Sequence, residues 1–72
     1  MAFMGKVDLE QEFWDELQQQ IANLVVAGHR NASTAGPLAF ERATSAVGQR
    51  HGLSTLAMAK TVEGATRRFG QA

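Results

Sequence analysis

Few side chains in this sequence are placed to perform acid–base or nucleophilic chemistry. Its two histidines, His29 and His51, lie far apart and lack the Glu-flanked or Cys-flanked spacing that zinc sites need. The acids Glu12, Asp15 and Glu16 fall at surface spacing on a predicted helix, which is typical of a solvated face rather than of paired catalytic carboxylates. No serine lies in a nucleophile elbow, and the sequence contains no Gly-rich phosphate loop after a strand. We therefore expect a protein that is not an enzyme and that has no metal site and no cofactor.

Charge is unevenly distributed along the chain, although the formal net charge is zero. Before Pro37 there are five acids and two bases, whereas from Pro37 onwards there are five bases and two acids, so the halves carry −3 and +3. The basic half could form a surface that binds phosphate, whereas the neutral total argues against strong non-specific attraction to nucleic acid. The alternative is that the two halves attract each other within a monomer or a dimer.

Length and composition predict a single domain over residues 1–72 with a thin core. A chain of 72 residues buries only about 60% of the surface that its unfolded form exposes, and without cysteine it has no disulfide to add stability. Self-association or a protein partner is therefore an expected source of stability. The sequence contains no long apolar run and no signal-peptide segment, so we expect no membrane segment and a cytoplasmic location.

The first predicted helix spans residues 9–27 and follows an apolar arm at residues 1–7. Asp8 is a favourable N-cap, because its carboxylate can accept hydrogen bonds from the free amides of the first turn. Apolar residues then recur at spacings of three and four, as on one face of an amphipathic helix, and Gly28 begins a segment that breaks it. Val26 falls on the side of the helix opposite to this apolar face. The expected association surface on this helix comprises Leu9, Phe13, Trp14, Leu17, Ile21, Leu24 and Val25.

Two further helices are predicted at residues 37–51 and 54–69, and no segment alternates as a strand does. Pro37 suits the first helical position, since its missing amide donor would be unpaired there. Gly52 is expected as a left-handed C-cap and Ser54 as the next N-cap. The apolar sides of these helices carry Phe40, Ala43, Val47 and His51, and then Met58, Val62, Ala65 and Phe69. The sequence therefore predicts an all-α, three-helix domain with a long N-terminal amphipathic helix.

Residues 44–64 resemble the helix-turn-helix of DNA-binding proteins. That pattern has a small residue in one helix, a glycine four places later, an apolar residue directly after it and another apolar residue six places after the glycine. Here these residues are Gly48, Gly52, Leu53 and Met58. The small residue and the glycine would let the two helices cross closely. His51 and Thr61 depart from the pattern, because apolar residues are usual at both positions.

The resemblance implies that the third helix lies in the major groove of duplex DNA. The expected base-contacting residues are Ser54, Thr55, Lys60 and Glu63, and the expected phosphate-contacting residues are Arg50, Arg67 and Arg68. A small dimeric DNA-binding regulator of transcription is the function that this resemblance implies. The alternative is a protein–protein interaction module, such as an adaptor, an inhibitor or a subunit of a larger assembly. The neutral total charge favours that alternative, as does Leu56 on an otherwise polar side of the third helix.

Overall fold

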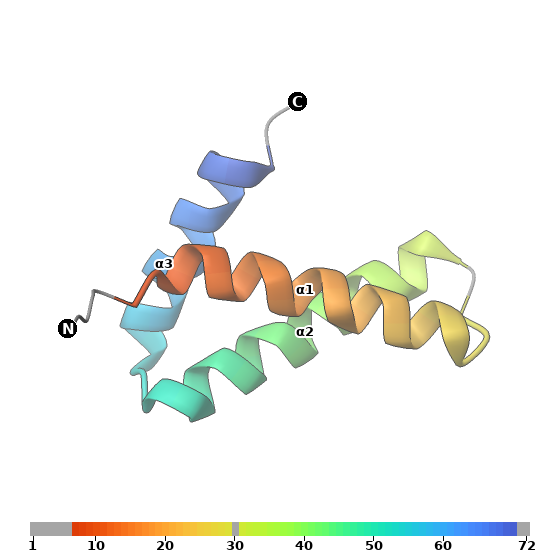
Figure 1. Ribbon diagram of the computed structural model, residues 1–72, viewed down its shortest axis with the longest axis horizontal. Helices are drawn as coiled ribbons and strands as arrows, with labels where there is room; N and C mark the ends of the chain where they lie inside the picture. Colours follow the sequence, from red (N-terminus) through yellow and green to blue (C-terminus); the bar gives the residue numbers. More distant parts are fainter. Residues whose placement is uncertain (1–6, 30, 71–72) are drawn as a thin grey trace, which may run out of the picture.

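The computed structural model describes residues 7–29 and 31–70, and these residues form three helices and no strand. Helix α1 spans Leu9–Val26, α2 spans Ala32–His51 and α3 spans Thr55–Phe69. α1 and α2 run antiparallel and side by side, and α3 crosses the N-terminal half of α1 (Figure 1). The expected all-α, three-helix class is therefore confirmed.

Helix α1 begins as the sequence predicts. The Asp8 carboxylate accepts a hydrogen bond from the Gln11 amide at 3.1 Å and so caps the first turn. The helix ends at Val26, one residue before the predicted end, and Gly28 follows with φ of +101°. Residues 1–6 of the expected N-terminal arm lie outside the described residues.

Helix α2 begins at Ala32, five residues before the start predicted at Pro37. The reason is Asn31, whose side chain accepts a hydrogen bond from the Ser33 amide at 2.9 Å and whose carbonyl accepts amides of the next turn. Pro37 then lies exposed in the second turn, where its missing donor leaves only the Ser33 carbonyl without a helical partner. The residue before the proline is glycine, whose missing Cβ removes one of the clashes that disfavour a helical residue ahead of proline. The segment predicted as a break is thus the first turn of a helix.

The turn between α2 and α3 has the predicted conformation. Gly52 has φ of +60°, and Leu53 donates its amide to the Gly48 carbonyl at 2.9 Å, as in a Schellman C-cap. The Ser54 hydroxyl accepts a hydrogen bond from the Ala57 amide at 3.1 Å, which caps α3. A C-cap and an N-cap two residues apart therefore form a tight turn, from which α2 and α3 leave in different directions.

Two clusters of buried apolar side chains form the core. The first cluster joins all three helices and consists of Phe13, Ala43, Val47, Met58 and Ala65. The second cluster joins α1 to α2 and consists of Leu24, Ala35 and Ala39. Leu17 packs against both clusters. Half of the buried apolar residues in the described part of the chain are alanines, so the core contains few large side chains.

Two polar residues in the helix-turn-helix-like segment occupy positions that the pattern assigns to apolar side chains. The apolar pattern groups His51 with Val47, but His51 turns toward Glu12 of α1 and lies at hydrogen-bond distance from it, whereas Val47 is fully buried. An imidazole needs a polar partner for its N–H group, and the carboxylate supplies one. Thr61 is buried, and its hydroxyl donates to the Ala57 carbonyl at 2.9 Å. A hydrogen bond therefore accommodates each departure from the pattern.

The domain is elongated, with extents of 42 × 27 × 24 Å. α1 packs along both other helices, whereas α2 and α3 contact each other less. A Cβ added at Gly48 would lie 3.6 Å from the Met58 sulfur, which is an ordinary contact distance. The crossing at Gly48 is therefore not so close that it requires glycine, in contrast to the expectation from the helix-turn-helix pattern. No helix within the two described ranges is long and apolar enough to cross a membrane.

Candidate interaction surface

Three of the four residues predicted to contact DNA bases share one surface, and Lys60 does not. Ser54, Thr55 and Glu63 are exposed and line a groove between α2 and α3. Lys60 is also exposed, but it borders a shallow depression that Asp8 and Glu10 line as well. Lys60 therefore lies beside acidic residues at the start of α1 and does not line the groove.

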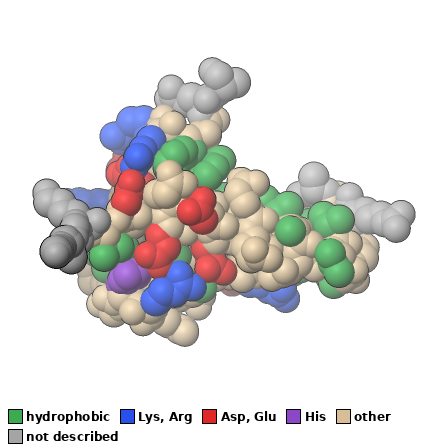
Figure 2. Space-filling model, viewed as in Figure 1, with side chains coloured by type: hydrophobic (Ala, Val, Ile, Leu, Met, Phe, Trp, Pro, Cys, Tyr) green, Lys and Arg blue, Asp and Glu red, His purple; other side chains and the backbone are tan. Residues whose placement is uncertain are grey.

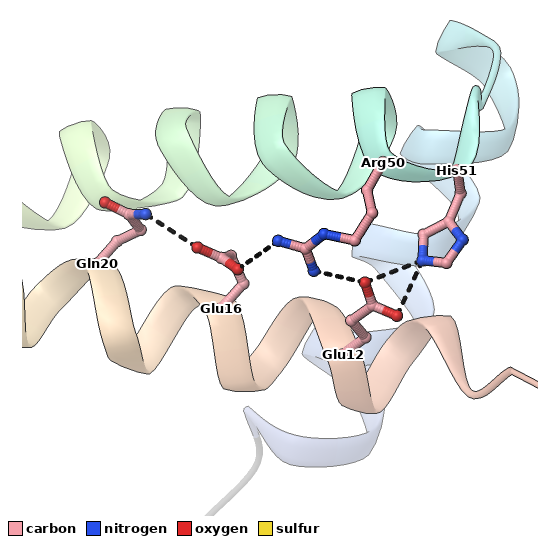
Figure 3. Close-up of polar contacts among 5 residues, drawn as sticks. All are labelled: Glu12, Glu16, Gln20, Arg50 and His51. Carbon is pink, nitrogen blue, oxygen red and sulfur yellow. Dashed lines mark hydrogen bonds and ion pairs between the residues drawn. The ribbon is translucent and has the colours of Figure 1, made fainter.

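Arg50, one of the residues predicted to contact phosphate, links α2 to α1 (Figure 3). Its guanidinium donates from Nη1 to Glu12 at 2.6 Å and from Nη2 to Glu16 at 3.0 Å. The Nε2 atom of His51 lies 2.9 Å from both carboxylate oxygens of Glu12, so this nitrogen carries the hydrogen. Gln20 donates to Glu16 at 2.9 Å. Side chains from two helices thus form one network.

This network favours the ionised forms of its acids. The hydrogen bond from His51, and then the one from Arg50, lowers the pKa of Glu12 below its ordinary value. The pKa of Glu16 is lowered chiefly by the hydrogen bond from Gln20 and then by the one from Arg50. Glu16 and then Glu12 raise the pKa of Arg50. Both carboxylates and the guanidinium are therefore charged near neutral pH.

The other two arginines predicted to contact phosphate also have acidic partners. Nη1 of Arg68 lies 2.9 Å and 3.1 Å from the two carboxylate oxygens of Asp8, and 3.6 Å from Glu10. A backbone amide of the first turn, and then Arg68, lowers the pKa of Asp8. Arg67 pairs with Glu63 at 3.2 Å along α3, where both side chains are largely exposed. Arg68 thus links α3 to α1, whereas Arg67 is paired within its own helix.

The opposite charges of the two halves of the sequence therefore meet between helices. Figure 2 shows acidic, basic and histidine side chains gathered where α1 crosses α3 and the end of α2. Phosphate would have to compete with carboxylates for the N–H groups of Arg50 and Arg68. Of the lysines and arginines in the described part of the chain, Arg42 and Lys60 form no ion pair.

Most residues of the predicted association surface on α1 pack within the chain. Phe13 and Leu24 are buried, and Trp14 stacks on Phe69 with ring centroids 5.6 Å apart. Val25 remains 53% exposed. The partly buried members that pack against the core are Leu9, Leu17 and Ile21. A partner could reach Phe13 and Leu24 only if α2 moved away from α1.

A groove of about 890 Å³ lies between α2 and α3. All the described residues that line it belong to α2, α3 or the turn between them. Its apolar lining consists of Phe40, Leu53, Met58, Ala59 and Val62, together with Gly48 and Gly52. Its polar lining includes Thr44, Ser45, Gln49, Ser54, Thr55 and Glu63. The groove therefore combines an apolar surface with hydroxyl, amide and carboxylate groups.

Two large apolar side chains at this groove are exposed to solvent. Phe40 is 41% exposed, although its ring packs edge-on against Phe13 with centroids 5.6 Å apart. Leu56 is 67% exposed, and it shares a side of α3 with Ala59 and Glu63, which line the groove. In the sequence, Leu56 on an otherwise polar side of the third helix indicates a contact surface. The groove beside it depends on how α2 and α3 diverge, which the sequence does not specify.

No family model, curated protein or solved structure matches this chain. The choice of function therefore depends on the geometry of its surface. Within residues 7–29 and 31–70, no group of three or more His, Cys, Asp or Glu side chains is placed to hold a metal ion. The groove and the interhelical ion pairs are the features that can discriminate between binding functions.

Proposed function

We propose that this protein binds another protein by receiving the apolar side of a helix in the groove between α2 and α3. The groove itself supports this proposal, since about 890 Å³ of space is lined by apolar residues with polar groups among them. Amphipathic helices dock in such grooves through apolar side chains spaced three and four residues apart. A helix in this position would cover Phe40 and the exposed edge of Val62.

A helix suits this groove better than an extended segment does. An extended partner commonly adds to the free edge of a sheet, and the described part of the chain contains no strand. The polar side chains of Ser45, Gln49 and Thr55 are placed to contact the polar flanks of a bound helix. The apolar lining would then supply affinity, and the polar groups would set the orientation of the partner.

The charges around the groove favour protein over duplex DNA. Glu63 is the charged residue among its described lining, which includes no lysine or arginine. Arg50 and Arg68 contact carboxylates at the start of α1. Contacts from Lys and Arg to phosphate supply most of the non-specific affinity for DNA. The geometry therefore supports the protein-binding alternative more than the DNA-binding regulator.

A peptide titration tests this proposal. The probe is an amphipathic helical peptide of about 14 residues, or about 21 Å of helix, with leucines at three- and four-residue spacings. The control is a scrambled peptide of the same composition. In isotope-labelled monomeric protein, we expect the helical peptide to shift the amide resonances of Gly48 and Gly52, which line the groove, but not those of Gly28 and Gly36. Equal shifts with both peptides, or shifts confined to α1, would contradict the proposal.

Two matched substitutions test the location of the bound helix. Ala59 and Ala22 are both exposed residues within helices, but Ala59 lines the groove and Ala22 lies on α1. Ala59→Glu buries a carboxylate against the bound helix, so we expect it to weaken peptide binding at least about tenfold. Ala22→Glu adds the same charge elsewhere and should leave binding unchanged. Equal weakening by both substitutions would locate the bound peptide outside the groove.

A further inference from the structure

We infer that the helix received by this groove belongs to a second copy of the chain, so that α2 and α3 form a two-fold dimer interface; this inference rests on the proposed function. The single chain is spread out for its size, because its radius of gyration of 13.1 Å is the value of a compact domain of about 100 residues. Half of the buried apolar residues that the structure describes are alanines. A second copy would cover the groove and add large side chains to a core that contains few.

A two-fold axis along the groove would place α3 of each copy over α2 of the other, with both turns at the same end. Figure 1 shows α2 and α3 leaving the turn in different directions. Helix α2 of one copy can therefore lie over α3 of its partner, and α3 over α2. Residues at equal distances from the turn then face each other. An interface of this kind uses the same surface on both copies, so that surface must be complementary to itself.

The surface around the groove meets this requirement in shape. Leu56 is 67% exposed and projects beside the groove, and Gly48 has no side chain and lines it. Leu56 lies two residues after Ser54, and Gly48 lies four residues before Gly52, so they are about 3 Å and 6 Å along their helices from the turn. Leu56 of each copy would therefore enter the recess at Gly48 of the other.

The surface is also complementary to itself in charge. Glu41 on α2 and Arg67 on α3 are exposed, and they lie about 16 Å and about 20 Å from the turn along their helices. They would therefore face each other twice in the dimer. Arg67 already pairs with Glu63, but a guanidinium has donors for a second carboxylate, as Arg50 demonstrates by contacting two acids. The net charge of zero leaves little repulsion between copies.

Sedimentation of the full chain over about 1 µM to 1 mM tests this inference. The mass should rise with concentration from 7.8 kDa to twice that value. Ala59→Glu should raise the dissociation constant of the dimer at least about tenfold, whereas Ala22→Glu should leave it unchanged. A mass of 7.8 kDa throughout would overturn the inference. So would a dimer that the two substitutions weaken equally, because its interface would not be the groove.

An exchange of charges tests the orientation of the two copies. Glu41→Arg and Arg67→Glu each place like charges opposite one another in both symmetric contacts, so each should raise the dissociation constant about tenfold. An equal mixture of the two variants restores opposite charges at both contacts and should recover the mass of the parent. Circular dichroism verifies that each variant is folded. A mixture no more dimeric than its components would overturn the inference.

Sedimentation and peptide titration separate the inference from the proposed function. A chain that stays monomeric but shows shifts at Gly48 and Gly52 with the helical peptide retains the proposed function and refutes the dimer. A dimer that Ala59→Glu leaves intact also refutes the inference, without bearing on peptide binding by the monomer. A monomeric chain whose groove accepts no helical peptide contradicts both, whereas a dimer that Ala59→Glu weakens supports the inference even if the generic peptide fails to bind.

Discussion

Glu12 joins the end of α2 to α1, because it is bonded by both His51 and Arg50. These partners lower the pKa of Glu12 below its ordinary value of 4.5. The ionised carboxylate therefore stabilises the folded chain above about pH 4.5, and this contribution is lost as the pH falls through the lower pKa of the folded state. We predict that Glu12→Gln lowers the free energy of unfolding at neutral pH by about 0.5–1 kcal/mol. The variant should also lose less stability than the parent between about pH 5 and pH 3.

Thermal unfolding followed by circular dichroism across this pH range measures both effects of Glu12→Gln. Asp15→Asn is the matched control, since Asp15 lies on the same helix and forms no ion pair with any residue that the structure describes. This control should keep the pH dependence of the parent. If Glu12→Gln keeps it as well, the carboxylate at Glu12 contributes no measurable stability.

The two glycines near the turn should respond to alanine in opposite directions. Gly52 has φ of +60°, so Gly52→Ala should lower the free energy of unfolding by about 1 kcal/mol. Gly48 lies inside α2 with room for a Cβ 3.6 Å from the Met58 sulfur, so Gly48→Ala should raise the free energy of unfolding by about 0.5–1 kcal/mol. Urea unfolding of the monomer measures both. Destabilisation by Gly48→Ala would mean that α2 and α3 cross as closely as the helix-turn-helix pattern predicts.

Among the helices, α1 unites the core, and Leu17 is the residue where its two clusters meet. Leu17→Ala should lower the free energy of unfolding by about 2–3 kcal/mol, because it removes contacts with both clusters. Leu17→Asp should abolish folding, since it buries a charge there. Val26 lies on the same helix but is 88% exposed, and Val26→Ala should change stability by less than about 0.5 kcal/mol. Urea unfolding compares the variants, and a loss for Leu17→Ala no larger than for Val26→Ala would contradict this description of the core.

Helix ends that depend on short-range signals were predictable from the sequence. Asp8 and Ser54 each bond an amide three residues ahead, and Gly52 needs only its own left-handed conformation, so these caps were predicted correctly. The predicted start of α2 at Pro37 is wrong, because an N-cap signal at Asn31 competes with the signal from the proline. The Asn31 cap favours an early start, Pro37 disfavours one, and the burial of Ala35 against Leu24 adds packing to the first turns.

The ion pairs and the groove could not be located from the sequence, because they bring distant residues together. Arg50 and Glu12 are 38 residues apart, and Arg68 and Asp8 are 60 residues apart. The uneven charge along the sequence is compatible with a phosphate-binding surface and with attraction between the two halves. The partners of each arginine depend on how the helices cross, which the sequence does not specify. For the same reason, the exposed Leu56 indicated a contact surface without indicating the groove beside it.

At the scale of the whole molecule, the internal pairing of charge predicts weak binding to DNA. The net charge is zero, and Arg42 and Lys60 are the described bases without an ion pair. The logarithm of the binding constant falls with the logarithm of salt concentration by about 0.9 for each phosphate neutralised. Lys6 and Arg30 lie outside the described residues, and if they bound phosphate as well, four bases would give a slope of about −3.6. We therefore predict a slope no steeper than this for mixed-sequence duplex DNA, measured by fluorescence anisotropy across a salt series.

A slope of about −4 or steeper would contradict this prediction, because it would require the paired arginines to exchange carboxylates for phosphates. The substitution Arg50→Gln tests whether Arg50 is one of the residues that bind phosphate. If Arg50 binds phosphate, this substitution should make the slope shallower by about one. If Arg50 serves only to join the helices, the substitution should leave DNA binding unchanged and lower the stability of the fold, because Glu12 and Glu16 lose a shared partner. The salt slope and the unfolding free energy of one variant therefore discriminate between an arginine that binds DNA and an arginine that holds α2 to α1.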